Sequence, residues 1–81
     1  MLVRYFAGAR AAAGLEEQTV DLSGGETIAD LVAHLGAQHG GDLPRVLSLC
    51  SFLIDGTVSR DPSTPLDGHR GVDVLPPFAG G

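Results

Sequence analysis

The segment "TIADLVAHLGAQHGG" (residues 27–41) carries the strongest structural signal in the sequence, because it contains the clearest helix of the chain. Thr27 and Asp30 stand at the N-cap and N3 positions of a capping box, which predicts where the helix begins. The glycine pair that starts at Gly40 predicts where it ends. Between these limits the apolar residues repeat at i, i+3, i+4 and i+7, which predicts one apolar stripe: Ile28, Leu31, Val32 and Leu35.

Segments typical of β-strands lie on both sides of this helix. Each is short, rich in β-branched or aromatic residues and bounded by turn residues. Asp55-Gly56 is a hairpin turn signal, which predicts that a short strand returns directly after it. The segments are LVRYF (2–6), EEQTVDL (16–22), CSFLID (50–55), TVS (57–59) and VDVLP (72–76).

Two shorter helical segments and one long loop complete the pattern. Residues 7–14 are rich in alanine and end at Gly14, so we predict a short helix there. Residues 42–49 predict one further helical turn, started by Asp42 with Pro44 early in the turn. Residues 60–71 are predicted to be a loop. One main helix covering one sheet is an α+β architecture.

Composition excludes several classes of function. The 81 residues correspond to one domain, and the net charge of −5 argues against a nucleic-acid-binding module. No apolar run approaches the roughly 20 residues of a membrane helix, and no signal peptide is visible. The single cysteine, Cys50, excludes an internal disulfide and fits a reducing compartment, so we expect a cytoplasmic protein.

The chain ends in "PPFAGG" (76–81), which we interpret as a working tail. Pro76 and Pro77 lack an N–H group, so they end a β-ladder and stiffen the chain that follows. Glycines without a β-carbon can enter a narrow channel. We therefore divide the chain into a domain (1–76) and a tail (77–81). The alternative is a frayed terminus, since terminal residues are often disordered.

Three sequence elements resemble the MoaD/ThiS family of ubiquitin-like sulfur carriers. They are the Phe6, Arg10 and Gly14 spacing, the FLIDG segment (52–56) and the Pro-Pro-x-x-Gly-Gly ending, which looks most like MoaD. The resemblance implies a β-grasp fold, with a mixed sheet of about five strands packed on one main helix and a flexible C-terminal tail. It also implies that the first and last strands pair in parallel at the sheet centre.

The resemblance also implies a function that needs partner proteins. Gly81 would be adenylated by an ATP-dependent, MoeB-type activating enzyme and converted to a thiocarboxylate with sulfur from a donor. The chain would then act with the large, MoaE-type subunit of molybdopterin synthase, in a hetero-tetramer, on cyclic pyranopterin monophosphate. It would not be an enzyme on its own, and ATP would be used by the activating enzyme, with no cofactor bound here.

The same resemblance assigns roles to the residues of the tail. Gly81 would be the reactive residue, and Gly80 and Ala79 would give it access. The chain departs from the family at Ala11, where many relatives carry an acidic residue, and in the longer, less acidic loop 67–71. The expected partner-binding residues are Phe78, Pro77, Pro76, Leu75 and Arg10.

Other residues have alternative interpretations. Arg10 could equally belong to a solvated helix face. Cys50 could be a sulfur-relay thiol, but a small buried residue fits better because no second cysteine or lysine neighbours it. His34 and His39 lie five apart, which does not place them on one ligand-binding face, so we expect no metal site.

Three rival functions stay open on sequence alone. The first is a carrier for thiazole or cysteine biosynthesis, and the double proline disfavours it. The second is a ubiquitin-like protein modifier joined to targets through Gly81, although a chain without lysine cannot form lysine-linked chains of itself. The third is a structural β-grasp interaction domain, for which Gly80 and Gly81 would be dispensable.

Overall fold

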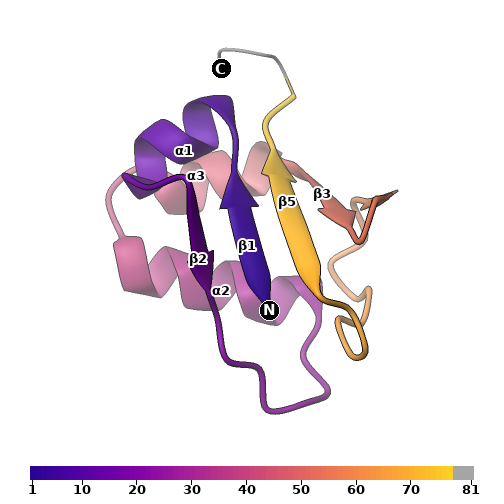
Figure 1. Cartoon of the computed structure of the whole chain (residues 1–81). Coiled ribbons are helices and arrows are strands. Elements are labelled where there is room, and N and C mark those ends of the chain that lie inside the picture. The colour runs from indigo at the N-terminus through magenta and orange to yellow at the C-terminus, as the bar shows by residue number, and fades with distance from the viewer. Residues whose placement is uncertain (78–81) are drawn as a thin grey trace.

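The computed structural model describes residues 1–77, in which helices cover one face of a five-stranded sheet (Figure 1). The strands lie in the order β2-β1-β5-β3-β4. In chain order the elements are β1 (Leu2–Tyr5), α1 (Ala7–Ala13), β2 (Glu17–Thr19), α2 (Ile28–His39), α3 (Leu43–Leu49), β3 (Ser51–Ile54), β4 (Thr57–Ser59) and β5 (Gly71–Leu75).

The sheet contains both parallel and antiparallel pairs. The first and last strands of the chain, β1 and β5, lie next to each other in its middle. β1 and β5 run parallel, with Leu2 opposite Gly71 and Tyr5 opposite Val74. β2 pairs antiparallel with β1, and β3 pairs antiparallel with both β5 and β4. This arrangement confirms the β-grasp topology that the family resemblance implies.

The main helix, α2, begins and ends as predicted. The Thr27 hydroxyl accepts the Asp30 backbone N–H at 3.4 Å, and the Asp30 carboxylate accepts the Thr27 backbone N–H at 2.9 Å. This reciprocal capping box satisfies two N–H groups that a helix end would otherwise leave without partners. At the other end, the helix stops at His39 and Gly40 is its C-cap.

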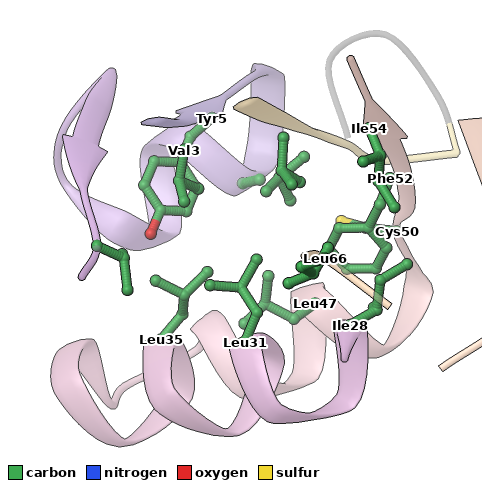
Figure 2. Close-up of a cluster of buried hydrophobic side chains, with 14 of the residues drawn as sticks. Val3, Tyr5, Ile28, Leu31, Leu35, Leu47, Cys50, Phe52, Ile54 and Leu66 are labelled. Carbon is green, nitrogen blue, oxygen red and sulfur yellow. The ribbon is translucent and has the colours of Figure 1, made fainter. Parts of the chain in front are cut away.

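The core lies between the sheet and the helices (Figure 2). Side chains of Leu31 and Leu35 point from α2 toward Val3 and Tyr5 of β1. Val32, which also belongs to the predicted stripe, is only partly buried and packs against this cluster. The buried apolar residues are Val3, Tyr5, Ala9, Val20, Ile28, Leu31, Leu35, Leu43, Leu47, Cys50, Phe52, Ile54, Leu66, Val72 and Val74.

Residues 42–49 form more helix than the single turn predicted. α3 has seven residues, because Leu43 and Leu47 are both buried and fix its orientation against the core. Asp42 precedes it without capping it through its side chain. The Asp42 carboxylate instead binds the guanidinium of Arg45, with oxygen to nitrogen distances of 2.8 and 2.7 Å.

The long loop predicted at 60–71 packs partly against the rest of the fold and does not lie wholly on the surface. Leu66 is buried, and Pro65 forms an isolated β-bridge with Thr27. Gly71, predicted to be in this loop, is the first residue of β5. The Asp55-Gly56 hairpin turn is confirmed, with φ angles of 46° and 88°, as a type I′ turn requires.

Three predicted strands were too long, since 2–6 ends at Tyr5, 16–22 covers only Glu17–Thr19 and 50–55 covers only Ser51–Ile54. The last strand has the predicted length but is shifted by one residue, from 72–76 to Gly71–Leu75. β2 ends at Thr19, opposite Leu2, because β1 has no earlier strand residue for it to pair with. β3 begins at Ser51, since Cys50 is the C-cap of α3. β5 ends at Leu75, the last residue before a proline that cannot donate to the ladder. Within residues 1–77, no helix has the length and apolar character needed to cross a bilayer.

Candidate functional site

The candidate site begins where β5 leaves the sheet. Leu75 pairs with Ser51 of β3 and is half-buried, as is Pro76, while Pro77 is exposed. These three residues form what we call the tail root. The other predicted tail residues, Phe78, Ala79, Gly80 and Gly81, lie outside the described residues. The central strand of the sheet therefore leads directly into the proline pair, as the sequence predicts.

Phe6 lies beside the tail root, directly after the neighbouring strand β1. Its backbone N–H donates to the Val74 carbonyl at 3.3 Å, which extends the β1–β5 pairing by one residue. Tyr5 and Val74 are opposite one another and both buried. Successive side chains on a strand point to opposite faces, so Phe6 and Leu75 lie on the face that the helices leave uncovered, which we call the open face. Phe6 is 38% exposed.

The open face carries further apolar residues on β3 and β4. Leu53 is half-buried and lies opposite Val58, which is 61% exposed. Leu53 is also opposite Asp73 of β5. We call Phe6, Leu53, Val58 and Leu75 the open-face patch. A group of exposed and half-buried apolar side chains near the exit point of a tail is typical of a protein-binding surface.

An ion pair lies among these apolar residues. Arg4 binds Asp73 through two hydrogen bonds, with Nε–Oδ1 at 2.7 Å and Nη2–Oδ2 at 2.8 Å. The hydrogen bonds to Asp73 raise the pKa of Arg4. The guanidinium carbon of Arg4 also lies 5.7 Å from the Phe6 ring centroid, within the range of a cation–π interaction. Asp73 therefore orients Arg4, and Arg4 contacts Phe6 beside the tail root.

A shallow pocket adjoins the tail root on its helical side. Its volume is about 150 Å³. Leu49, the last residue of α3, contributes to the pocket and is 50% exposed. The prediction from sequence did not include Leu49, since its exposure depends on how α3 packs. The lining residues are Gly8, Asp42, Arg45, Val46, Leu49, Pro76 and Pro77.

Arg10 is not brought to this pocket. It lies exposed on α1, and its Nη1 is 3.2 Å from the carboxylate of Glu16, just before β2. β2 is an edge strand on the far side of β1 from β5. This exposed pair matches the solvated-helix interpretation, while a role for Arg10 in partner binding stays a prediction.

Cys50 is a buried residue in the core, with 6% of its surface exposed. Its thiol donates a hydrogen bond to the Val46 carbonyl at 3.1 Å, and burial raises its pKa. A raised pKa disfavours the reactive thiolate. The buried interpretation therefore describes Cys50 better than a sulfur-relay thiol does.

Two of the three histidines make local contacts. His39 Nε2 contacts Gln18 Oε1, an oxygen that also accepts the Tyr5 hydroxyl at 2.6 Å. His69 Nδ1 lies 3.2 Å from the Asp55 carboxylate. Within residues 1–77, no three histidine, cysteine, aspartate or glutamate side chains come together as a metal site would require.

A mixed sheet with parallel central strands, packed on α2 and continued by a proline-stiffened C-terminal segment, defines a ubiquitin-like β-grasp protein. The chain belongs to the ThiS family, whose model matches residues 3–81. The match extends over the tail as well as the described domain.

Individual relatives resemble the chain over nearly its whole length. A molybdopterin synthase sulfur carrier subunit from Chlamydomonas reinhardtii is 37% identical over 98% of this chain and 95% of its own. The small archaeal modifier protein 1 of Haloferax volcanii superposes with a TM-score of 0.80 at 21% identity, covering 96% of this chain and 97% of its own, and shows the shared fold. A complex of subunits 1 and 2 of the molybdopterin-converting factor from Helicobacter pylori contains a similar chain, with a TM-score of 0.65, 26% identity and coverage of 99% and 96%.

Proposed function

We propose that this chain is the sulfur-carrying small subunit of a molybdopterin synthase. The observation that carries the proposal is the 37% identity to a molybdopterin synthase sulfur carrier subunit across almost all of both chains. The described structure supports it, because the central strand ends at a proline pair beside the exposed side chains of Phe6 and Leu49. In this role the chain supplies a reactive terminus, and the catalytic pocket belongs to its partner.

The chemistry is assigned to the carboxylate of Gly81. A free carboxylate is a poor electrophile, so a separate activating enzyme first uses ATP to form an acyl-adenylate and release pyrophosphate. A sulfur nucleophile from a donor then displaces AMP and leaves a C-terminal thiocarboxylate. The thiocarboxylate delivers its sulfur to cyclic pyranopterin monophosphate in the large subunit, to form the dithiolene of molybdopterin.

The residues near the tail would position this terminus. Fixing the backbone of a residue costs about 1–2 kcal/mol, so ordering residues 78–81 costs several kcal/mol. Burial of Phe78 in a partner pocket would return only about 1.5–3 kcal/mol. The large subunit must therefore also bind the domain, and we assign this contact to the tail root and the open-face patch around Phe6 and Leu75.

The same surface defines the expected partners. The large subunit and the activating enzyme must each receive the tail, so both would contact the tail root. Assembly with a dimeric large subunit would give a hetero-tetramer of two small and two large subunits. Since the chain carries a net charge of −5, basic surfaces on these partners would speed association.

The test is the intact mass of the full chain, carrying an N-terminal tag so that Gly81 stays free. The mass is measured before and after incubation with ATP, a sulfur donor and extract of its own cells. We expect a gain equal to one sulfur replacing one oxygen, located in the C-terminal peptide. A variant that lacks Gly80 and Gly81 is the matched control and should show no gain.

Two results would count against the proposal. An unchanged mass, in an extract whose activating enzyme is shown to be competent, would make the tail a docking or conjugation peptide. A sulfurated chain that copurifies with a thiazole- or cysteine-forming enzyme, and not with a pterin-binding large subunit, would place the carrier in another pathway.

A further inference from the structure

Every lysine or arginine position of the chain is an arginine. The five are Arg4, Arg10, Arg45, Arg60 and Arg70, and the 81 residues include no lysine. The difference matters beside an activated carboxyl group. A lysine amine can lose its proton and attack an acyl group, whereas an arginine guanidinium stays protonated in proteins and is not a nucleophile.

Arg4 contacts Phe6 beside the tail root, and Arg45 lines a pocket with the prolines of the tail root itself. Arg45 lines the same pocket as Pro76 and Pro77, and its guanidinium is held by two hydrogen bonds to Asp42. Gly81 is four residues beyond Pro77, and four extended residues span at most about 14 Å. A nucleophile at position 45 would therefore be within reach of the C-terminal acyl group of the same molecule.

The other strong nucleophiles are kept from the tail in different ways. The Cys50 thiol is buried and donates to the Val46 carbonyl. The α-amino group of Met1 donates to the Val20 carbonyl at 2.8 Å. Because β1 and β5 are parallel, Met1 lies at the end of the sheet opposite the tail root (Figure 1).

We propose that this arrangement protects the activated C-terminus from its own chain, with Arg45 as the critical position. The inference rests on the proposed function, in which Gly81 passes through an acyl-adenylate. Attack by an amine would form a C–N bond, break the bond between the acyl carbon and the AMP oxygen, and release AMP and a proton. The amide product has no carboxylate left to activate, so each such event would remove one carrier from the cycle.

The test uses the full chain prepared as a Gly81 α-thioester from an intein fusion. The thioester stands in for the adenylate, so the reaction needs no activating enzyme. Wild-type chain, Arg45→Lys and Arg45→Gln are incubated at about pH 8, and intact masses are followed. Both variants lose the pair of guanidinium hydrogen bonds to Asp42, but only Arg45→Lys introduces an amine.

We expect the wild type and Arg45→Gln to hydrolyse to the free acid. Arg45→Lys should instead give a species one water lighter than the free acid, at least tenfold more abundant than in the wild type. Digestion should locate the new amide between residues 45 and 81. Leu49→Lys, a second lysine in the same pocket, should behave as Arg45→Lys does.

Either of two results would overturn the inference. One is formation of the lighter species in the wild type at the level of the lysine variants, and the other is its absence from both lysine variants when circular dichroism shows them folded. Failure of the proposed function is distinguishable, because it would appear as absent sulfuration in extract while the thioester result stands.

Discussion

The side-chain carboxylate of Asp55 accepts the backbone N–H of Arg70, whose nitrogen lies 3.0 Å from Oδ2 and 3.2 Å from Oδ1. The same carboxylate accepts the Gly71 N–H at 2.9 Å. Asp55 occupies the first central position of the β3–β4 turn, and Gly71 begins β5. One side chain therefore connects a hairpin turn to the start of the strand that leads to the tail root.

These contacts predict an acid-sensitive stability. The hydrogen bond from the Arg70 backbone N–H is the main cause that lowers the pKa of Asp55 in the folded state. The Gly71 backbone N–H and the His69 side chain lower it further. A lowered folded-state pKa stabilises the protein above the unfolded-state value of roughly 3.9, and this stabilisation is lost as the pH falls further. We expect the Tm to fall progressively below about pH 5 in melts followed by circular dichroism.

Asp55→Asn separates this contribution from that of other carboxylates. Asp42 and Asp61 also have lowered pKa values, so the variant should keep part of the acid dependence. We expect its Tm to be lower than that of the wild type at pH 7, with the difference shrinking toward pH 3. A constant difference across that range would show that the Asp55 charge does not stabilise the fold.

The only tyrosine of the chain permits a direct spectroscopic prediction. Tyr5 is buried, and this burial raises its pKa to about 12. Its hydroxyl donates to Gln18, which favours the neutral phenol further. In the folded protein, tyrosinate absorbance should stay low at pH 10–11, and stability should decline as the pH rises above the unfolded value of roughly 10.

Denatured chain is the control for that titration, and its tyrosine should ionise near pH 10. Gln18→Leu removes the acceptor of the Tyr5 hydroxyl and puts an apolar side chain in its place. The hydroxyl then has no hydrogen-bond partner there, so the Tm should fall. Ionisation of native Tyr5 near pH 10, with the far-ultraviolet circular dichroism unchanged, would contradict the burial described for it.

Cys50→Ala tests whether the thiol has a chemical role. Removing the buried sulfur should cost about 1 kcal/mol of unfolding free energy, the central value for point substitutions. Thiocarboxylate formation on Gly81 should be unchanged, because the Cys50 thiol is buried and bonded to Val46. Loss of sulfuration in a folded Cys50→Ala protein would instead establish the relay thiol.

Local signals predicted the parts of the fold that local interactions decide. The capping box at Thr27 and the Asp55-Gly56 turn depend on residues within a few positions of each other, and both are present. The parallel pairing of Leu2 with Gly71 joins opposite ends of the chain, and periodicity does not encode it. It was predictable only through the family resemblance.

The site shows the same division. The exit of the chain at Leu75 and Pro76 follows from proline chemistry and was predicted. The exposure of Phe6 and Leu49 beside that exit follows from how β1 and α3 pack, which the sequence pattern does not show. Arg10 matched the family spacing, yet its side chain pairs with Glu16 on the far side of β1.

The open-face patch can be tested through binding of the large subunit. Phe6→Glu places a charge beside the tail root, and Ala37→Glu places the same charge on an exposed position of α2, on the helical side of the sheet. Burial of a phenylalanine side chain contributes about 1.5–3 kcal/mol, so Phe6→Glu should weaken binding at least tenfold. Isothermal titration calorimetry with purified large subunit gives the Kd, and Ala37→Glu should match the wild type. Equal affinities for the two variants, with both proteins folded, would mean that the partner holds the tail without contacting the open face.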